Sequence, residues 1–367
     1  MVVRREVVRL KDTVRLTDLA DKIYKNLEPG KYVGNLAPSL GLIVQRDLGI
    51  AYVEVSEEFL NPETFLLFTY FRDPVKEALR SVNEALQRGE TSVVFPLTHA
   101  MGLGKTHFLT ILYHLYLNIP ERWENIRNYS AQKPGLQELV KTLEEVEYDV
   151  NVAKRTLLIP IDLKYRPIGL TRYKALFEYL KRIIERKETW LKQARISEKG
   201  LAELKDLLGN LSEKDPLQAA KELVMVLDKH SIRLPVLILV DELYASAIEA
   251  ILGKSEEEAD DLRKVLVFIS SLIDNLEGKQ PAVLVYASAL QDIQSWDNIE
   301  VPVKENWPES LKILKTTVDY FKNRMQRISM KSVGEVTEEE ALEIVKKRIV
   351  EFKAPLDNIL EKFNEVK

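Results

Sequence analysis

Four short runs of continuous apolar residues place the strongest constraint on the fold of this chain. Sequence patterns typical of helices separate the runs, which span residues 91–97, 156–163, 236–241 and 282–287. Strands that are apolar on both sides are buried on both faces, as in a parallel sheet that helices cover. The alternation of such strands with helices therefore predicts an α/β fold, in which an open parallel sheet is flanked by helices. We expect a weaker fifth strand at residues 328–333.

The distribution of these patterns also predicts a division of the chain. We expect an N-terminal extension at residues 1–69, a core at residues 70–335 and the start of a helical lid at residues 336–367. Within the core, residues 171–229 form a helical insert that is longer than a crossover between strands needs. We expect this insert to be interrupted at Gly200, Gly209 and Pro216.

Capping residues mark several predicted helix starts. Asn61 and Asp73 each precede a proline, the residue favoured at the first position of a helix. The second of these helices should end at Arg88, because a glycine follows it. Near the end of the chain, Thr337 is followed three residues later by a glutamate, so a helix is predicted to run from there through Phe352.

Composition narrows the classes of function. Hydrophobic residues make up 46% of the 367 residues and charged residues 30%, which is typical of a globular domain. The absence of cysteine excludes disulfides and thiolate metal sites, and four histidines leave little for a zinc centre. A formal net charge of −4 argues against a surface that binds nucleic acid over its whole extent. Since no apolar run has the length of a membrane span, we expect a cytoplasmic protein without a membrane partner.

A glycine-containing loop follows the first predicted strand and leads into an apolar helix at residues 105–118. The loop and the start of the helix read His99, Ala100, Met101, Gly102, Leu103, Gly104, Lys105, Thr106 and His107. This order fits the phosphate-binding pattern G-x-x-x-x-G-K-S/T, except that His99 replaces the first glycine. In such a loop, backbone N–H groups surround phosphate oxygens, the lysine contacts the β- and γ-phosphates, and the hydroxyl binds Mg²⁺. We therefore predict a P-loop that binds ATP, with Lys105 on the phosphates and Thr106 on magnesium.

The third predicted strand ends in two carboxylates, Asp241 and Glu242. Ligands of open α/β sheets bind at the carboxyl ends of the strands, where this pair would face the loop. We predict that Asp241 holds the magnesium ion and that Glu242 polarises the water that attacks the γ-phosphate. This pair predicts an enzyme that hydrolyses the β–γ phosphoanhydride of ATP. The alternative is a buried strand that ends in a solvated acidic turn.

Three further residues are candidates for catalysis. Ser288 follows the fourth strand and would orient water near the γ-phosphate. Arg324 and Arg327 precede the weak fifth strand and are candidates for arginine fingers, which would reach the nucleotide of a neighbouring subunit in a homo-oligomer. A small residue at a strand end and a solvated helix face explain the same residues about equally well.

Structural explanations are favoured for two other groups of residues. His107 and His114 lie two turns apart on the helix after the loop, and they lack a third ligand for a metal. The predicted helix at residues 171–190 either contacts nucleic acid or presents a solvated surface, and the second is favoured. Its cations are Arg172, Lys174, Lys181, Arg182, Arg186 and Lys187.

Taken together, these motifs resemble a large, uncharacterised family of prokaryotic AAA+-like ATPases. In that family the loop ends in G-x-G-K-T-H and continues into a helix with Leu-Tyr-His-Leu, which residues 102–107 and 112–115 match. The Asn-Pro-Glu-Thr-Phe sequence at residues 61–65, the Val-Asp-Glu-Leu sequence at residues 240–243 and the glutamate-rich helix at residues 339–349 also match. The resemblance covers most of the chain after the first 60 residues.

The resemblance implies an AAA+-like P-loop NTPase that uses ATP and Mg²⁺. Family members are longer, so we expect an N-terminal part of such a protein or a shortened relative. Their genes commonly neighbour DNA methylases and helicases, which implies DNA and DNA-modifying proteins as partners in a defence or modification assembly. The family has glycines at the positions of His99 and Ala100, and this departure leaves the rate of hydrolysis open.

Three functions compete at this point. The leading hypothesis is an ATPase whose nucleotide cycle drives a DNA-associated assembly. The second is a nucleotide-binding switch or scaffold with little or no hydrolysis, which His99 favours. A P-loop kinase is disfavoured by the Asp241–Glu242 pair and by the long helical insert. Turnover of ATP distinguishes the first from the second, and transfer to an acceptor other than water would identify the third.

Overall fold

The computed structural model describes residues 14–16, 38–88, 92–97, 104–194, 196–230, 232–299, 308–325 and 350–352. Its centre is a parallel sheet that consists of β2 (Ser92–Leu97), β3 (Leu157–Asp162), β4 (Val236–Asp241) and β5 (Ala282–Ala287). The strand order is β2-β5-β4-β3, so β5 separates β2 from β4. The prediction of an α/β fold with a parallel sheet is confirmed, and the predicted strand ends lie within one residue of those observed.

Helices connect the strands. Before β2 lie α3 (Leu40–Asp47), α4 (Glu57–Leu60), α5 (Pro62–Leu67) and α6 (Asp73–Arg88). Between β2 and β3 lie α7 (Lys105–Tyr113), the π-helical segment η1 (His114–Asn118), α8 (Ile119–Ser130), α9 (Pro134–Glu145) and α10 (Val150–Arg155). Between β3 and β4 lie α11 (Arg172–Gln193), α12 (Glu198–Leu211) and α13 (Pro216–Lys229). The remaining helices are α14 (Leu243–Leu252), α15 (Glu256–Leu276), α16 (Leu290–Asn298) and α17 (Glu309–Met325).

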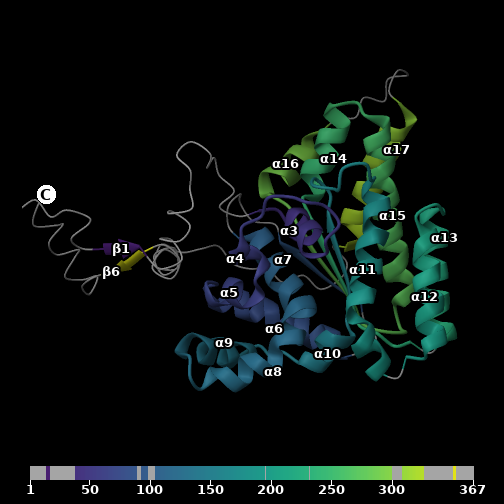
Figure 1. Ribbon diagram of the computed structural model, residues 1–367. Helices are drawn as coiled ribbons and strands as arrows, with labels where there is room; N and C mark the ends of the chain where they lie inside the picture. The colour runs from purple at the N-terminus through teal and green to yellow at the C-terminus, as the bar shows by residue number, and fades with distance from the viewer. Residues whose placement is uncertain are drawn as a thin grey trace, which may run out of the picture.

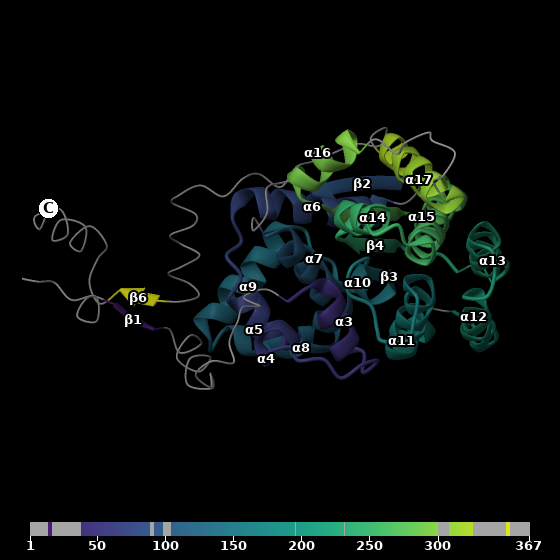
Figure 2. The same cartoon turned by 90° about the horizontal axis from the view of Figure 1, so that it is seen from above.

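Two hydrophobic cores lie on opposite faces of the sheet, because alternate residues of each strand point in opposite directions. On β4, Val236, Ile238 and Val240 join one core, while Leu237 and Leu239 join the other. The first core is built with α11 to α17, and the second with α3, α5 to α10 and a second side of α11; the helices are shown in Figure 1 and Figure 2. Helices therefore cover both faces of the sheet, and in open α/β sheets ligands bind at the carboxyl ends of the strands.

Helix α3 belongs to the second core, although it lies within the predicted N-terminal extension. Its residues Leu40, Ile43 and Val44 are buried, and it packs against β3 and α7. Part of the segment at residues 1–69 is therefore packed on the sheet.

The helical insert is interrupted at different places from those predicted. Gly200 and Gly209 both lie inside α12, so the prediction that they interrupt the insert is wrong. The breaks instead come before Ser197 and Asp215, whose side chains accept hydrogen bonds from the first backbone N–H groups of α12 and α13. Pro216 does mark a boundary, because it occupies the first position of α13.

The two glycines of α12 give opposite predictions for stability. A Cβ at Gly209 would meet no atom within 4 Å among the described residues, so Gly209→Ala should raise the free energy of unfolding by about 0.5–1 kcal/mol. At Gly200 a Cβ would lie 2.9 Å from Cγ of His230 and 3.1 Å from Oγ of Ser197, so Gly200→Ala should lower it by about 1–3 kcal/mol. Urea denaturation of both variants checks the pair, and equal effects would contradict the packing.

The prediction that a helix runs through Phe352 is wrong at the C-terminal end of that helix. Residues Val350–Phe352 form β6, which pairs antiparallel with β1 (Val14–Leu16). A capping pattern reports only local preference, whereas this pairing joins segments more than 300 residues apart. The predicted fifth strand at residues 328–333 and the rest of the predicted lid lie outside the described residues.

No helix in the described ranges has the length and apolar character to cross a membrane.

Candidate functional site

Predicted site residues from β4 and α7 meet at the carboxyl edge of the sheet. All four strands are parallel, so their carboxyl ends share this edge. There, Oγ1 of Thr106 donates a hydrogen bond to Oδ2 of Asp241 over 3.0 Å. The two residues are 135 positions apart in the chain, so the fold itself brings the hydroxyl and the carboxylate together. His99, Ala100, Met101, Gly102 and Leu103 lie outside the described residues.

Gly104 has the left-handed backbone conformation that favours glycine. Its φ of 82° and ψ of 16° place it before the first residue of α7, in a region that residues with a side chain enter at an energetic cost. Lys105 and Thr106 then form the first turn of the helix. This conformation gives a physical reason for a glycine immediately before the lysine.

The charge balance around Lys105 is dominated by carboxylates. Burial lowers the pKa of Lys105, and this shift is opposed by the nearby carboxylates of Glu242, Asp241 and Asp292. Asp292, in the first turn of α16, was not predicted as a site residue. Lys105 therefore supplies a positive charge among the carboxylates at this edge of the sheet.

Glu242 has an unusual backbone conformation. It lies between β4 and α14 with a φ of 58° and a ψ of 38°, which costs a residue other than glycine roughly 1 kcal/mol or more. Burial raises the pKa of Glu242, and the charge of Asp162 raises it further, whereas Lys164 and Lys105 lower it. Such a carboxyl has an increased affinity for a proton, as a base that accepts one from water needs.

Asp241 is buried, with 1% of its surface exposed. Burial raises its pKa well above the usual value, and the neighbouring charges of Asp162 and Glu242 act in the same direction. Hydrogen bonds from Thr106 and from the backbone N–H of Glu242 oppose this shift. A divalent cation at Asp241 would favour the charged form, since it supplies the opposite charge that the buried carboxylates lack.

Asp162 is a site residue that the sequence analysis missed. It ends β3 in register with Asp241 on the adjacent strand, and 4% of its surface is exposed. Its carboxylate accepts backbone N–H groups from Gly41 at 3.0 Å, Lys164 at 2.8 Å and Tyr165 at 2.9 Å. The sequence pattern that could have identified Asp162 is an aspartate at the end of an apolar run, which is the same pattern that identified Asp241.

Ser288 lies at the end of β5 and is buried. Its backbone N–H donates to the carbonyl of Leu97 on β2, and its Oγ accepts the backbone N–H of Tyr244 over 3.2 Å. The hydroxyl thus holds the first turn of α14, two residues after Glu242. Of the two candidate arginine fingers, Arg324 lies in the last turn of α17 with only its backbone described, and Arg327 is outside the described residues.

Both histidines of the loop helix contact the segment around α5. Nε2 of His107 lies 3.0 Å from Oγ1 of Thr69, and the ring of His107 packs on that of Phe65 at 4.6 Å between centroids. Nε2 of His114 donates to the carbonyl of Phe59 at 2.8 Å, and its Nδ1 accepts from Asn118 at 2.9 Å. These contacts agree with the structural role predicted for both residues.

His114 should make stability depend on pH. Burial lowers its pKa from 6.5 to about 4, so the fold favours neutral imidazole, and its contribution to stability is lost as pH falls from 6.5 towards 4. Between pH 7 and pH 5 the free energy of unfolding should fall by about 2 kcal/mol more in the wild type than in His114→Gln. Glutamine retains a donor for Phe59 but does not titrate. Parallel urea titrations at both pH values test this, and equal slopes would contradict it.

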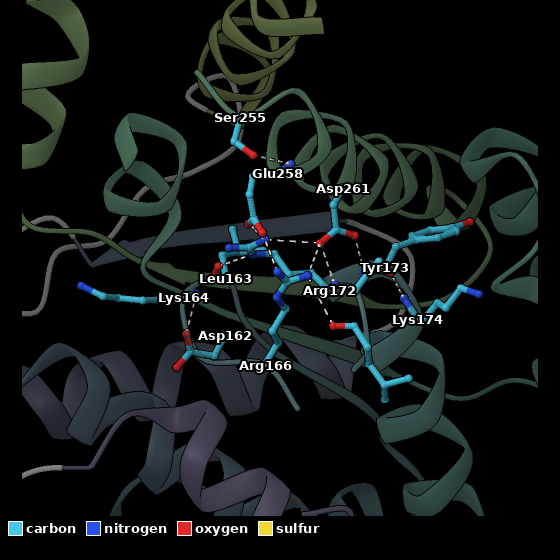
Figure 3. Close-up of polar contacts among 12 residues, drawn as sticks. Asp162, Leu163, Lys164, Arg166, Arg172, Tyr173, Lys174, Ser255, Glu258 and Asp261 are labelled. Carbon is cyan, nitrogen blue, oxygen red and sulfur yellow. Dashed lines mark hydrogen bonds and ion pairs between the residues drawn. The ribbon is translucent and has the colours of Figure 1, made fainter. Parts of the chain in front are cut away.

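The cations of α11 do not form a free basic surface. Arg172 is buried in an ion-pair cluster with Glu258 and Asp261, which also includes Arg166 (Figure 3). Lys187 is buried and donates to two backbone carbonyls at 2.8 and 2.6 Å. The favoured description of a solvated surface is therefore wrong for Arg172 and Lys187, and neither is placed to contact nucleic acid. Three of the others form ion pairs with acidic side chains, namely Lys174, Arg182 and Arg186.

In the described part of the chain, no three His, Cys, Asp or Glu side chains are grouped to hold a metal ion by themselves. Magnesium does not require such a group, since it is bound by one or two carboxylates together with phosphates and water. A hydroxyl and a carboxylate 3.0 Å apart therefore fit this ion better than zinc.

Comparison with protein families identifies one similarity. Residues 15–194 match the model of the DUF499 N-terminal domain. The match covers just under half of the chain. It includes α7 and β3 and ends before β4, which carries Asp241 and Glu242. A search of curated proteins gave no match.

Proposed function

We propose that this chain binds Mg²⁺·ATP at the carboxyl edge of the sheet and hydrolyses its β–γ phosphoanhydride. The observation that carries the proposal is the 3.0 Å hydrogen bond between Thr106 and Asp241. A hydroxyl at a helix N-terminus and a carboxylate at a strand end are the two protein ligands that magnesium takes in P-loop NTPases. In the sheet, β5 lies between β2, which precedes the loop, and β4, which carries the two carboxylates.

Each residue has a separate part in this reaction. Thr106 and Asp241 would hold magnesium, directly or through water, and Lys105 would contact the β- and γ-phosphates. The N-terminus of α7 and the preceding loop would supply backbone N–H groups to the phosphates. Glu242 would orient the attacking water and accept its proton, since its raised pKa favours protonation. Ser288 supports this arrangement because it holds the helix turn that follows Glu242.

Two parts of the proposal depend on the resemblance to prokaryotic AAA+-like ATPases. These are the DNA-associated assembly that hydrolysis would drive and the homo-oligomer in which Arg324 or Arg327 would reach a neighbouring nucleotide. We therefore propose an AAA+-like P-loop ATPase, with DNA and DNA-modifying proteins as partners.

A steady-state ATPase assay of the full chain tests this function. Phosphate release should require Mg²⁺ and ATP, and DNA should increase the rate if the assembly acts on DNA. ATP binding without turnover, with or without DNA, would replace the ATPase by a nucleotide-binding switch. Absence of ATP binding would reject the site altogether.

A further inference from the structure

We infer that Asp162 is a positioning residue of the proposed reaction. It fixes the N-terminus of α3 at the carboxyl edge of the sheet, and α3 in turn braces the helix that carries Lys105 and Thr106. This inference rests on the proposed function, and it assigns Asp162 no contact with the nucleotide.

The first part of the argument is the contact between α3 and β3. Oδ2 of Asp162 accepts the backbone N–H of Gly41 in the first turn of α3 at 3.0 Å. Its other oxygen, Oδ1, accepts the N–H group of Lys164 (Figure 3) and that of Tyr165. A carboxylate that accepts N–H groups at a helix N-terminus is stabilised there by the helix dipole. One buried side chain thus fixes both α3 and the loop after β3.

Gly41 shows how closely α3 approaches this edge. A Cβ at position 41 would lie 2.4 Å from the carbonyl oxygen of Tyr165 and 2.7 Å from Cβ of Asp162. No real Cβ makes such contacts, so α3 sits at this distance only because residue 41 has no side chain. The same carbonyl of Tyr165 accepts a hydrogen bond from the buried side chain of Gln45 at 3.1 Å.

The other end of α3 is bound to the helix of the phosphate loop. Oδ2 of Asp47, the last residue of α3, accepts hydrogen bonds from three side chains on other elements. They are Tyr113 of α7 at 2.7 Å, Asn118 of η1 at 3.1 Å and Arg186 of α11 at 3.1 Å.

These contacts close a ring around the candidate site. From Thr106 the ring follows α7 to Tyr113, crosses to Asp47, follows α3 to Gly41 and reaches Asp162. Asp162 is paired in register with Asp241 on β4, and Asp241 accepts the hydroxyl of Thr106 at 3.0 Å. Helix α3 forms one side of this ring and joins β3 to α7. If the bond between Gly41 and Asp162 is lost, α3 no longer fixes the position of α7 relative to β4. Small displacements of reacting groups reduce turnover more than they reduce binding.

Asp162→Asn breaks one hydrogen bond of the ring and also removes a negative charge that raises the pKa of Glu242. The asparagine oxygen can still accept from Lys164 and Tyr165, but its amide then faces the N–H of Gly41, and two donors do not bond. We expect kcat for ATP to fall by roughly tenfold or more, while KM stays within about twofold. Gly41→Ala disturbs the same contact from α3 and Tyr113→Phe removes the bond to Asp47, and both leave the charge of Asp162 in place, so both should also lower kcat if positioning is the cause. The controls are Asp206→Asn and Gly209→Ala, on the exposed surface of α12.

All assays use the full chain at a temperature where circular dichroism shows every variant folded. Hydrogen exchange of α7 provides a second measurement, because Asp162→Asn should speed exchange there while the controls do not. Wild-type turnover with kcat of Asp162→Asn within about twofold of it would overturn the inference and leave the proposed function standing. A wild type that does not hydrolyse ATP would overturn the proposed function, and the positioning role with it.

Discussion

Lys105→Ala is expected to abolish ATP binding. Lys105 is the first residue of α7 and precedes Thr106, whose hydroxyl bonds to Asp241, and its ammonium would contact the β- and γ-phosphates in the proposed complex. Burial already lowers its pKa, and the attraction of nearby carboxylates offsets part of this effect. Removal of the cation would leave the phosphates facing those carboxylates without compensation. Affinity should fall by at least roughly 100-fold, or about 2.8 kcal/mol.

Isothermal titration calorimetry with Mg²⁺·ATP measures this loss. Lys199→Ala is a matched control, since Lys199 is an exposed lysine on α12 and has no part in the proposed site. Its affinity should equal that of the wild type. Unchanged affinity in Lys105→Ala would show that the loop before α7 does not bind the phosphates.

The strands of this fold are predictable because each is a continuous apolar run. In β4 and β5 every residue is buried, so the hydrophobic pattern alone specifies both elements. Their carboxyl ends then place Asp241 beside the loop helix without further information. The starts of α12 and α13 were less predictable, because capping by Ser197 and Asp215 decides them rather than the glycines.

Asp162 and α3 illustrate what the sequence does not reveal. The bond between Gly41 and Asp162 joins residues 121 positions apart, and no local pattern predicts which aspartate will accept a given N–H. In the sequence, Gly41 looks like an ordinary glycine near a helix start. The structure shows why a glycine is needed there: a Cβ at this position would lie 2.4 Å from the backbone carbonyl oxygen of Tyr165. Long-range close approach of this kind is a property of the packed chain, as is the pairing of β1 with β6.

Glu242→Gln is expected to separate ATP binding from hydrolysis. Glutamine has nearly the same size and can still bond to water, but it lacks the negative charge and cannot accept a proton. Catalysis by a positioned base contributes roughly 10² to 10⁴ in rate, so kcat should fall by at least roughly 100-fold. The affinity for ATP should stay within about threefold, because the lost interaction belongs to the transition state. The left-handed backbone at this position costs both side chains alike.

Single-turnover measurements with excess protein provide the test, since they report the chemical step separately from product release. Glu257→Gln is the matched control, because Glu257 is an exposed glutamate in the first turn of α15. It should hydrolyse ATP at the wild-type rate. If Glu242→Gln retains a rate within about threefold of the wild type, the barrier has changed by less than roughly 1 kcal/mol, and Glu242 is not the base. The raised pKa that burial and Asp162 give to Glu242 would then reflect only its place at a crowded acidic edge.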